Sequence, residues 1–137
     1  MKEVYFRAWH YLQKKMYYRA YQKLTHILLC AEDAQDEKGK PEYRAGFDEC
    51  ELMEGTSVLD QHGVEVFEKD IVRISIPGHS VVSLFQNVPD MYRSRGLHPL
   101  EDVFVAHQID KNSPELTFKI LGNMYENPEL IKEYHLS

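Results

Sequence analysis

The chain has 137 residues and a formal net charge of −6, with 43% hydrophobic and 12% aromatic residues. This composition supports a packed core and excludes a disordered chain, and no apolar run approaches the roughly 18–20 residues that span a bilayer. The length fits a single domain, or a small barrel with an attached subdomain.

The first residues, Met1-Lys2-Glu3-Val4-Tyr5-Phe6-Arg7, lack the apolar core of a signal peptide. We therefore expect the protein to stay in the cytoplasm of the cell that makes it, without a membrane partner. Cys30 and Cys50 do not form a C-x-x-C pair. In a reducing cytosol they are expected to be two buried free thiols.

Basic residues are concentrated in positions 1–24, which hold six lysines and arginines and one acid, a net charge of +5 that leaves −11 for the remainder. Seven aromatic residues lie among them. Such interleaving can bind single-stranded nucleic acid through phosphate attraction and base stacking. We favour an amphipathic hairpin with an aromatic core face, because the acidic remainder weakens attraction to a polyanion.

Strands are expected at Val4–Trp9 and Lys15–Tyr18, joined into a hairpin by a polar loop. Residues 21–31 are ambiguous, since apolar side chains recur at helical spacing while residues 25–30 also fit a buried strand. The polar, acidic segment 32–46 is predicted to be a loop, and Phe47–Met53 a further strand. We therefore divide the chain into an N-terminal subdomain, 1–53, and a C-terminal one, 54–137.

The C-terminal part has a cleaner β pattern. Val72, Ile74 and Ile76 alternate along one strand, which Pro77-Gly78-His79 ends with a turn before a returning strand at 80–86. Residues 87–99 are predicted to be irregular, with further strands at 103–109 and 116–121. A short helix is expected after Pro128, capped by Asn127. Short strands separated by turns suggest a small barrel or roll.

Two motifs stand out: Thr56 through Val72, containing Asp60-Gln61-His62-Gly63-Val64-Glu65-Val66-Phe67-Glu68-Lys69-Asp70, and Gly122-Asn123-Met124-Tyr125-Glu126-Asn127-Pro128-Glu129-Leu130. With Phe6-Arg7-Ala8-Trp9 and Lys14-Lys15-Met16-Tyr17, they resemble the YopX family of small phage and prophage proteins. The resemblance implies a mainly β fold with an SH3-like barrel in the C-terminal part, and favours a strand within 21–31. It implies no assigned activity, so no catalytic residue is carried over.

Two positions depart from the family pattern, with Ser57 and Lys69 where the family usually has glycine. A lysine forced to positive φ costs roughly 1 kcal/mol, so either the turn before Asp70 differs or the strain is tolerated. The motif residues themselves suit turns. Asp60 and Gly63 can form one, while Asp70, Asn123 and Asn127 can accept backbone amide hydrogens.

No catalytic, cofactor or metal site is predicted. The seven histidines show no H-x-H or H-x-x-x-H spacing, although zinc needs three or four converging ligands. His107 is expected to be partly buried on the strand at 103–109. His79 and Ser80 are adjacent and would point to opposite faces of a strand, and no phosphate-binding loop is present.

We therefore expect a non-enzymatic phage or prophage accessory protein that works through protein contacts, with a phage or host protein as partner and with homo-oligomers conceivable through strand edges. The alternatives are a nucleic-acid-binding module that uses the basic hairpin and an enzyme of unrecognised type. The candidate interaction surface comprises Arg7, Trp9, Lys14, Lys15, Arg19, Lys23, Tyr92, Arg93 and Arg95.

Overall fold

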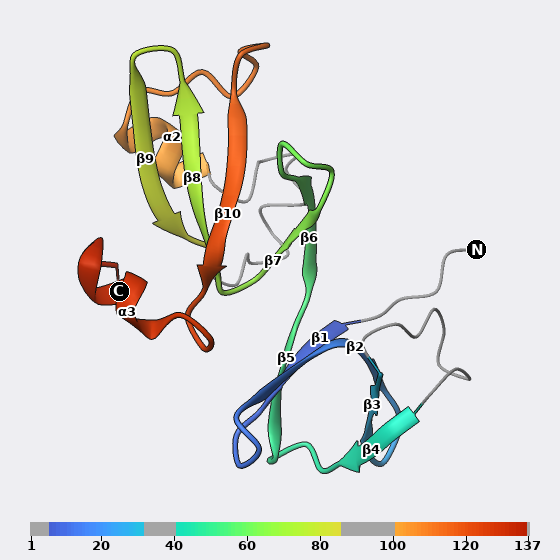
Figure 1. The fold of residues 1–137 in the computed structure, drawn as a ribbon. Coiled ribbons are helices and arrows are strands. Elements are labelled where there is room, and N and C mark those ends of the chain that lie inside the picture. The colour runs from blue at the N-terminus through green and yellow to red at the C-terminus, as the bar shows by residue number, and fades with distance from the viewer. Residues whose placement is uncertain (1–5, 32–40, 86–100, 137) are drawn as a thin grey trace. The chain divides into compact units, whose positions relative to one another are not determined.

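The computed structural model describes residues 6–31, 41–85 and 101–136. The chain divides into two compact units, residues 1–55 and 56–137 (Figure 1). The described residues are mainly in antiparallel strands, which confirms the predicted β class. No helix in the described ranges is long and apolar enough to cross a membrane.

Unit 1 is one five-stranded antiparallel sheet. Its strands are β1 (Phe6–His10), β2 (Lys15–Gln22), β3 (Ile27–Cys30), β4 (Pro41–Ala45) and β5 (Cys50–Met53), in the order β4-β3-β2-β1-β5. Figure 1 shows that the sheet curls strongly. A register shift between Phe6 and Ala8, where β1 pairs with β2, contributes to that curvature.

The curl encloses a small core of buried residues from all five strands: Ala8, Tyr17, Ala20, Ile27, Leu29, Ala45 and Cys50. Three of these residues are alanines, whose small side chains leave room in the core for the two large side chains of β3, Ile27 and Leu29. The free cysteines Cys30 and Cys50 are both buried, as expected from their isolated positions.

The structure decides between the alternatives for residues 21–31, because Ile27–Cys30 is strand β3 and not a helix. The predicted loop at 32–46 is wrong at its end. Residues 41–45 form β4, and residues 32–40 lie outside the described ranges. β4 is an edge strand in which Glu42, Tyr43 and Arg44 are exposed, as in a loop, while Ala45 is buried against Ile27.

Unit 2 contains a two-stranded sheet of β6 (Gly55–Leu59) and β7 (Glu65–Phe67). The first residue of β6, Gly55, is the last residue of unit 1 in the sequence. A three-stranded sheet has the order β10-β8-β9, from β8 (Asp70–Ile76), β9 (His79–Leu84) and β10 (Thr117–Asn123). Among the described residues neither sheet closes on itself, so the SH3-like barrel expected from the family resemblance is not confirmed.

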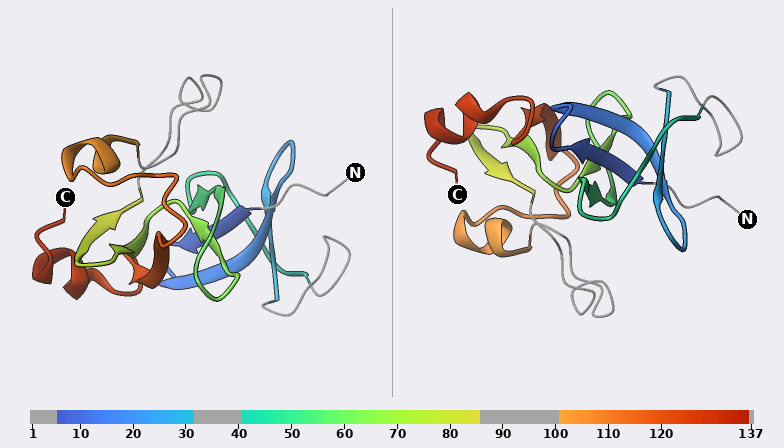
Figure 2. Two further views of the ribbon diagram at one scale, coloured as in Figure 1. Left: turned by 90° about the horizontal axis from the view of Figure 1, so that it is seen from above. Right: turned by 90° about the horizontal axis from the view of Figure 1, so that it is seen from below.

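Helices lie on both faces of the three-stranded sheet, α2 (Glu101–Ala106) on one and α3 (Pro128–Glu133) on the other (Figure 2). Phe104 of α2 packs into the main core cluster with residues of β8. On the opposite face, Arg73 Nη2 of β8 donates to Tyr134 Oη at the end of α3, at 3.3 Å. The sheet is thus covered by an apolar contact on one side and a partly polar one on the other.

The strand predicted at 103–109 is wrong, because this segment begins with helix α2. The β-branched run around Phe104 favours a strand, but the backbone hydrogen bonds of this segment are those of a helix. Phe104 is 3% exposed and its neighbour Val105 is 73% exposed. The amide of His107 donates to the carbonyl of Val103 at 3.0 Å. The side chain of His107 is exposed, so the prediction that it is partly buried on a strand is wrong.

Lys69 adopts the conformation that the family glycine would supply, with φ of 73°. The turn is retained because its neighbours fix it. The Lys69 amide donates to Phe85 O, the Lys69 carbonyl accepts from Met124 N, and Asp70 Oδ2 accepts from Phe67 N at 2.8 Å. The chain thus tolerates the strain and keeps the geometry. Ser57 lies within strand β6.

Replacing Lys69 with glycine is expected to stabilise the protein by about 0.5–1 kcal/mol, because glycine adopts positive φ without the Cβ penalty. Urea unfolding of Lys69→Gly measures this. Lys119→Gly is the matched control, since Lys119 is exposed within β10 and its loss to glycine should destabilise. Equal destabilisation in both variants would show that position 69 is not strained.

The asparagines of the second motif cap a turn and not a helix. Asn123 Oδ1 accepts from the amides of Tyr125 at 3.0 Å and Glu126 at 2.8 Å, and Asn127 Oδ1 accepts from Asn123 N at 3.1 Å. Asn127 occupies the N-cap position of α3, as predicted, but its side chain makes no cap hydrogen bond to the helix. The motif therefore fixes the turn that leads from β10 to α3.

Candidate interaction surface

The structure separates the candidate residues of the N-terminal hairpin. Arg7 is only 4% exposed and is not a surface residue. Trp9, Arg19 and Lys23 are half-buried, while Lys14 and Lys15 are exposed. The remaining candidates, Tyr92, Arg93 and Arg95, lie outside the described residues.

Arg19 and Lys23 meet at one aromatic ring. Arg19 Nη1 donates to Tyr21 Oη at 3.1 Å, and Lys23 Nζ lies 5.8 Å from the centroid of the same ring. Tyr21 is only 3% exposed, so its face is not available for stacking with a nucleic-acid base. These two cations therefore serve the packing of β2.

The loop between β1 and β2 is fixed by His10, which is 2% exposed. Its carbonyl accepts from Lys14 N at 2.9 Å, and its Nδ1 accepts from Gln13 N at 3.1 Å. Because Nδ1 is an acceptor here, a neutral His10 carries its proton on Nε2. Tyr17 Oη donates to Gln13 Oε1 at 2.6 Å and holds the loop from the core side.

The same histidine faces Glu49, in the turn between β4 and β5. His10 Nε2 lies 3.4 Å from Glu49 Oε2, and the Glu49 carbonyl accepts from Tyr11 N at 3.0 Å. Tyr43 of β4 packs edge-on against His10, with ring centroids 5.4 Å apart, and its hydroxyl approaches Glu49 Oε2 at 3.4 Å. Glu49 therefore ties the β1–β2 loop to the β4–β5 turn.

Four large apolar side chains are exposed around this tie. The exposed fractions are 48% for Tyr11, 85% for Leu12, 40% for Tyr43 and 49% for Phe47. Figure 1 shows the β1–β2 loop and the β4–β5 turn at the same end of the sheet. We call these four residues the hairpin-end surface. It was missed in the sequence, where the only signal was apolar residues within turn-forming segments.

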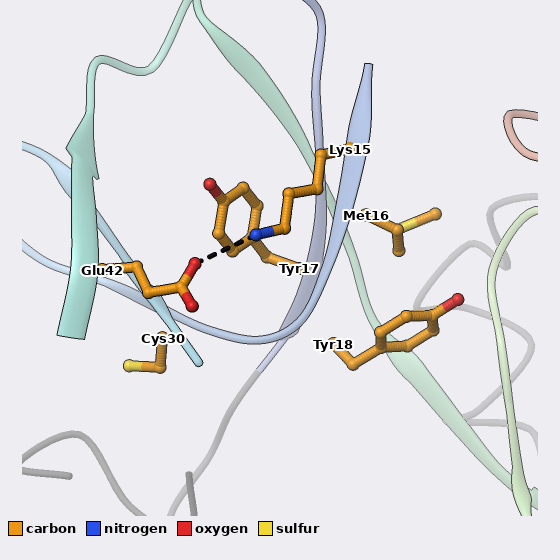
Figure 3. Close-up of a pocket in the computed structure, with 6 residues that line it drawn as sticks. All are labelled: Lys15, Met16, Tyr17, Tyr18, Cys30 and Glu42. Atoms are coloured by element: carbon orange, nitrogen blue, oxygen red, sulfur yellow. Dashed lines mark hydrogen bonds and ion pairs between the residues drawn. The ribbon is translucent and has the colours of Figure 1, made fainter. Parts of the chain in front are cut away.

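A pocket of about 140 Å³ lies beside β2, lined by Lys15, Met16, Tyr17, Tyr18, Cys30 and Glu42. Figure 3 shows the Lys15 ammonium group lying over the Tyr17 ring, 4.6 Å from its centroid, and reaching Glu42 Oε2 at 3.1 Å. The pocket is smaller than the roughly 300–1,000 Å³ typical of small-molecule sites. Its volume does not suit a drug-sized ligand.

Backbone contacts and burial set the protonation of this region. The hydrogen bond from Gly46 N, 2.9 Å from Glu49 Oε1, lowers the pKa of Glu49, and the contact with His10 adds to this effect. Burial raises the pKa of Cys50 to about 11, with a smaller contribution from the charge of Glu49. Near neutral pH Cys50 is thus a thiol and a poor nucleophile.

Acidification is expected to loosen the tie between loop and turn. The lowered pKa of Glu49 in the folded state means that its stabilising effect is present above its unfolded pKa and is lost as the pH falls through its folded pKa. Urea unfolding across this acidic range should therefore show a smaller pH dependence for Glu49→Gln than for the wild type. Glu51→Gln, on β5, is the control and should follow the wild type.

The described part of the chain contains no group of three or more histidine, cysteine, aspartate or glutamate side chains placed to hold a metal ion. The described residues form a small β protein of two units, with an exposed apolar surface at one end of the curled sheet of unit 1.

This protein belongs to the YopX family, whose model, described as YopX protein, matches residues 5–132. Its fold is similar to the crystal structure of protein EF1440 from Enterococcus faecalis, with a TM-score of 0.50 and 17% identity. The match covers 96% of this chain and 99% of the other. At this identity it supports the fold alone. No curated protein matches the chain.

Proposed function

We propose that this YopX-family protein is a phage or prophage accessory protein that acts in the host cytoplasm through protein contacts and not by catalysis. The observation that carries the proposal is the hairpin-end surface, in which Tyr11, Leu12, Tyr43 and Phe47 are all exposed and Tyr43 packs against His10 at the base of the loop. Aromatic residues are enriched in the cores of protein interfaces, where tyrosine combines an apolar ring with a hydroxyl.

Hydrogen bonds also order the backbone of the loop that carries Tyr11 and Leu12. The amides of Gln13 and Lys14 are bound by His10, and Tyr11 N is bound by Glu49. A loop that is already ordered loses little conformational entropy on association. The exposed ion pair of Lys15 and Glu42 provides a polar group close in sequence to Tyr43 and to the loop, as at the rim of an interface.

Affinity capture from phage-infected cells tests this proposal with paired variants. The double variant Leu12→Asp/Phe47→Asp places two charges in the hairpin-end surface and should lose the partner that the wild type retains. The control is Leu24→Asp, because Leu24 is 96% exposed in the β2–β3 turn and its substitution should leave capture unchanged. Retention of every captured protein by the double variant would contradict the proposal.

Nucleic acid remains the runner-up as a partner, and the burial of Arg7 and Tyr21 counts against it. With a net charge of −6, we expect single-stranded DNA or RNA to bind weakly or not at all at physiological salt. A mobility-shift titration checks this. Tight, salt-sensitive binding that is lost in Lys14→Ala/Lys15→Ala would place nucleic acid first.

A further inference from the structure

Two histidines that are 28 positions apart in the sequence come together in unit 2. His79 begins β9, directly after Gly78, which has φ of 81° in the turn from β8. His107 follows the last residue of α2. Their ring centroids are 6.2 Å apart with an interplanar angle of 41°, and both side chains are exposed. Sequence spacing could not reveal this pair, because the long segment between the two residues includes α2.

Both residues are presented by backbone that is fixed locally. His79 pairs with Ile76 across the β8–β9 turn. The His107 amide donates to Val103 O at 3.0 Å, and the next residue, Gln108, ends the helical path at φ of 53°. Phe104 and Ile109, on either side of His107 in the sequence, are buried in the same core cluster as Val72 and Ile74 of β8. The packing of α2 on the sheet therefore sets the distance between the two rings.

We propose that His79 and His107 form a two-histidine site for a divalent transition-metal ion of the zinc, nickel or copper type. With metal–nitrogen bonds of about 2.0–2.1 Å, the centres of two imidazole rings lie roughly 5 Å apart at a tetrahedral angle and roughly 6.4 Å apart when the rings are opposite each other across the metal. The observed separation of 6.2 Å lies between these two values and nearer the second, and exposed side chains can rotate to the shorter separation. Imidazole nitrogen suits these three metals, whereas Mg²⁺ and Ca²⁺ prefer oxygen ligands.

The site is open, because the protein supplies two ligands and water completes the coordination. It therefore differs from a closed structural zinc site, which has four protein ligands. Such a site links the β8–β9 turn to the end of α2. A bound ion should accordingly stabilise unit 2 against unfolding, because the unfolded chain does not hold the two rings together.

Isothermal titration of Zn²⁺ into the tag-free full chain, in a non-chelating buffer, tests the proposal. The wild type should bind roughly one equivalent, with saturation and a rise in melting temperature. His79→Ala and His107→Ala should each lose both effects. His62→Ala is the matched control and should behave as the wild type, since His62 is also exposed and lies in the β6–β7 turn, within 3.3 Å of Gln61.

Nuclear magnetic resonance with a trace of Cu²⁺ provides a second measurement, in which amide signals near positions 79 and 107 should broaden first. Absence of saturable Zn²⁺ binding by the wild type would overturn the proposal. So would binding that is unchanged in both alanine variants, or broadening centred on another histidine. Circular dichroism confirms that the variants fold, which is expected because both side chains are exposed.

Discussion

Replacing Gly122 with alanine is expected to destabilise the protein by about 2–4 kcal/mol, from overpacking together with the strain or loss of one hydrogen bond. A Cβ at this position would lie 2.6 Å from Asn127 Cγ and 3.0 Å from Asn127 Cβ. The asparagine cannot move aside freely, since its Oδ1 accepts from Asn123 N at 3.1 Å. Urea unfolding of Gly122→Ala measures the loss.

A double-mutant cycle separates the clash from other effects of the substitution. Asn127→Ala alone removes one hydrogen bond and should cost about 1 kcal/mol. In Gly122→Ala/Asn127→Ala the closest contacts, with the amide group of Asn127, are gone and only the Cβ contact at 3.0 Å remains. The combined cost should therefore be smaller than the sum of the two single costs. Additive costs, or a Gly122→Ala variant within about 0.5 kcal/mol of the wild type, would show that the close approach does not constrain this turn.

Truncation of Leu29 is expected to have the largest effect in unit 1, with Leu29→Ala costing about 2–5 kcal/mol. Leu29 is fully buried at the centre of the curled sheet, where β3 pairs with both β2 and β4. Its neighbours in the core include three alanines, which cannot extend to fill a cavity. Thermal and urea unfolding followed by circular dichroism measure the cost.

The same substitution at Leu24 provides the control, because Leu24 is 96% exposed. Leu24→Ala should stay within about 0.5 kcal/mol of the wild type, as is usual for surface positions. Similar losses at the two positions would mean that unit 1 is not organised around the core described above.

Local turn chemistry was the part of the fold best predicted from the sequence. Asp60 was expected to accept backbone amides and Gly63 to take positive φ. Asp60 Oδ1 accepts from His62 N at 2.9 Å and Val64 N at 2.8 Å, and Gly63 has φ of 80°. These features depend on residues within four positions, so the sequence contains all that determines them.

Features set by distant contacts were predicted poorly. Residues 103–109 favour a strand by composition, but burial of Phe104 against the β8–β9–β10 sheet selects a helix. β4 forms because β3 offers an open edge, although its own side chains resemble a loop. The family resemblance did not correct these errors, since it implied a barrel where the described strands form separate open sheets.

The candidate surface was predicted only in part for the same reason. Basic and aromatic residues suggested the N-terminal hairpin, and its loop does contribute Tyr11 and Leu12 to the hairpin-end surface. Tyr43 and Phe47 join them because β4 pairs with β3 and because Glu49 ties the turn to the loop. Neither contact can be recognised from spacing along the chain. The same holds for the burial of Arg7, which lies on β1 opposite Met53 of β5 and is 4% exposed.

The central claim is that the protein contacts its partner through the hairpin-end surface. Photo-crosslinking in phage-infected cells tests it most directly, with a photoreactive amino acid placed either at position 12 or at position 24. Both positions hold highly exposed leucines, at 85% and 96%, in different turns of unit 1. We predict a discrete crosslinked adduct from position 12 and none from position 24. Adducts from position 24 alone, or from neither position, would contradict the claim.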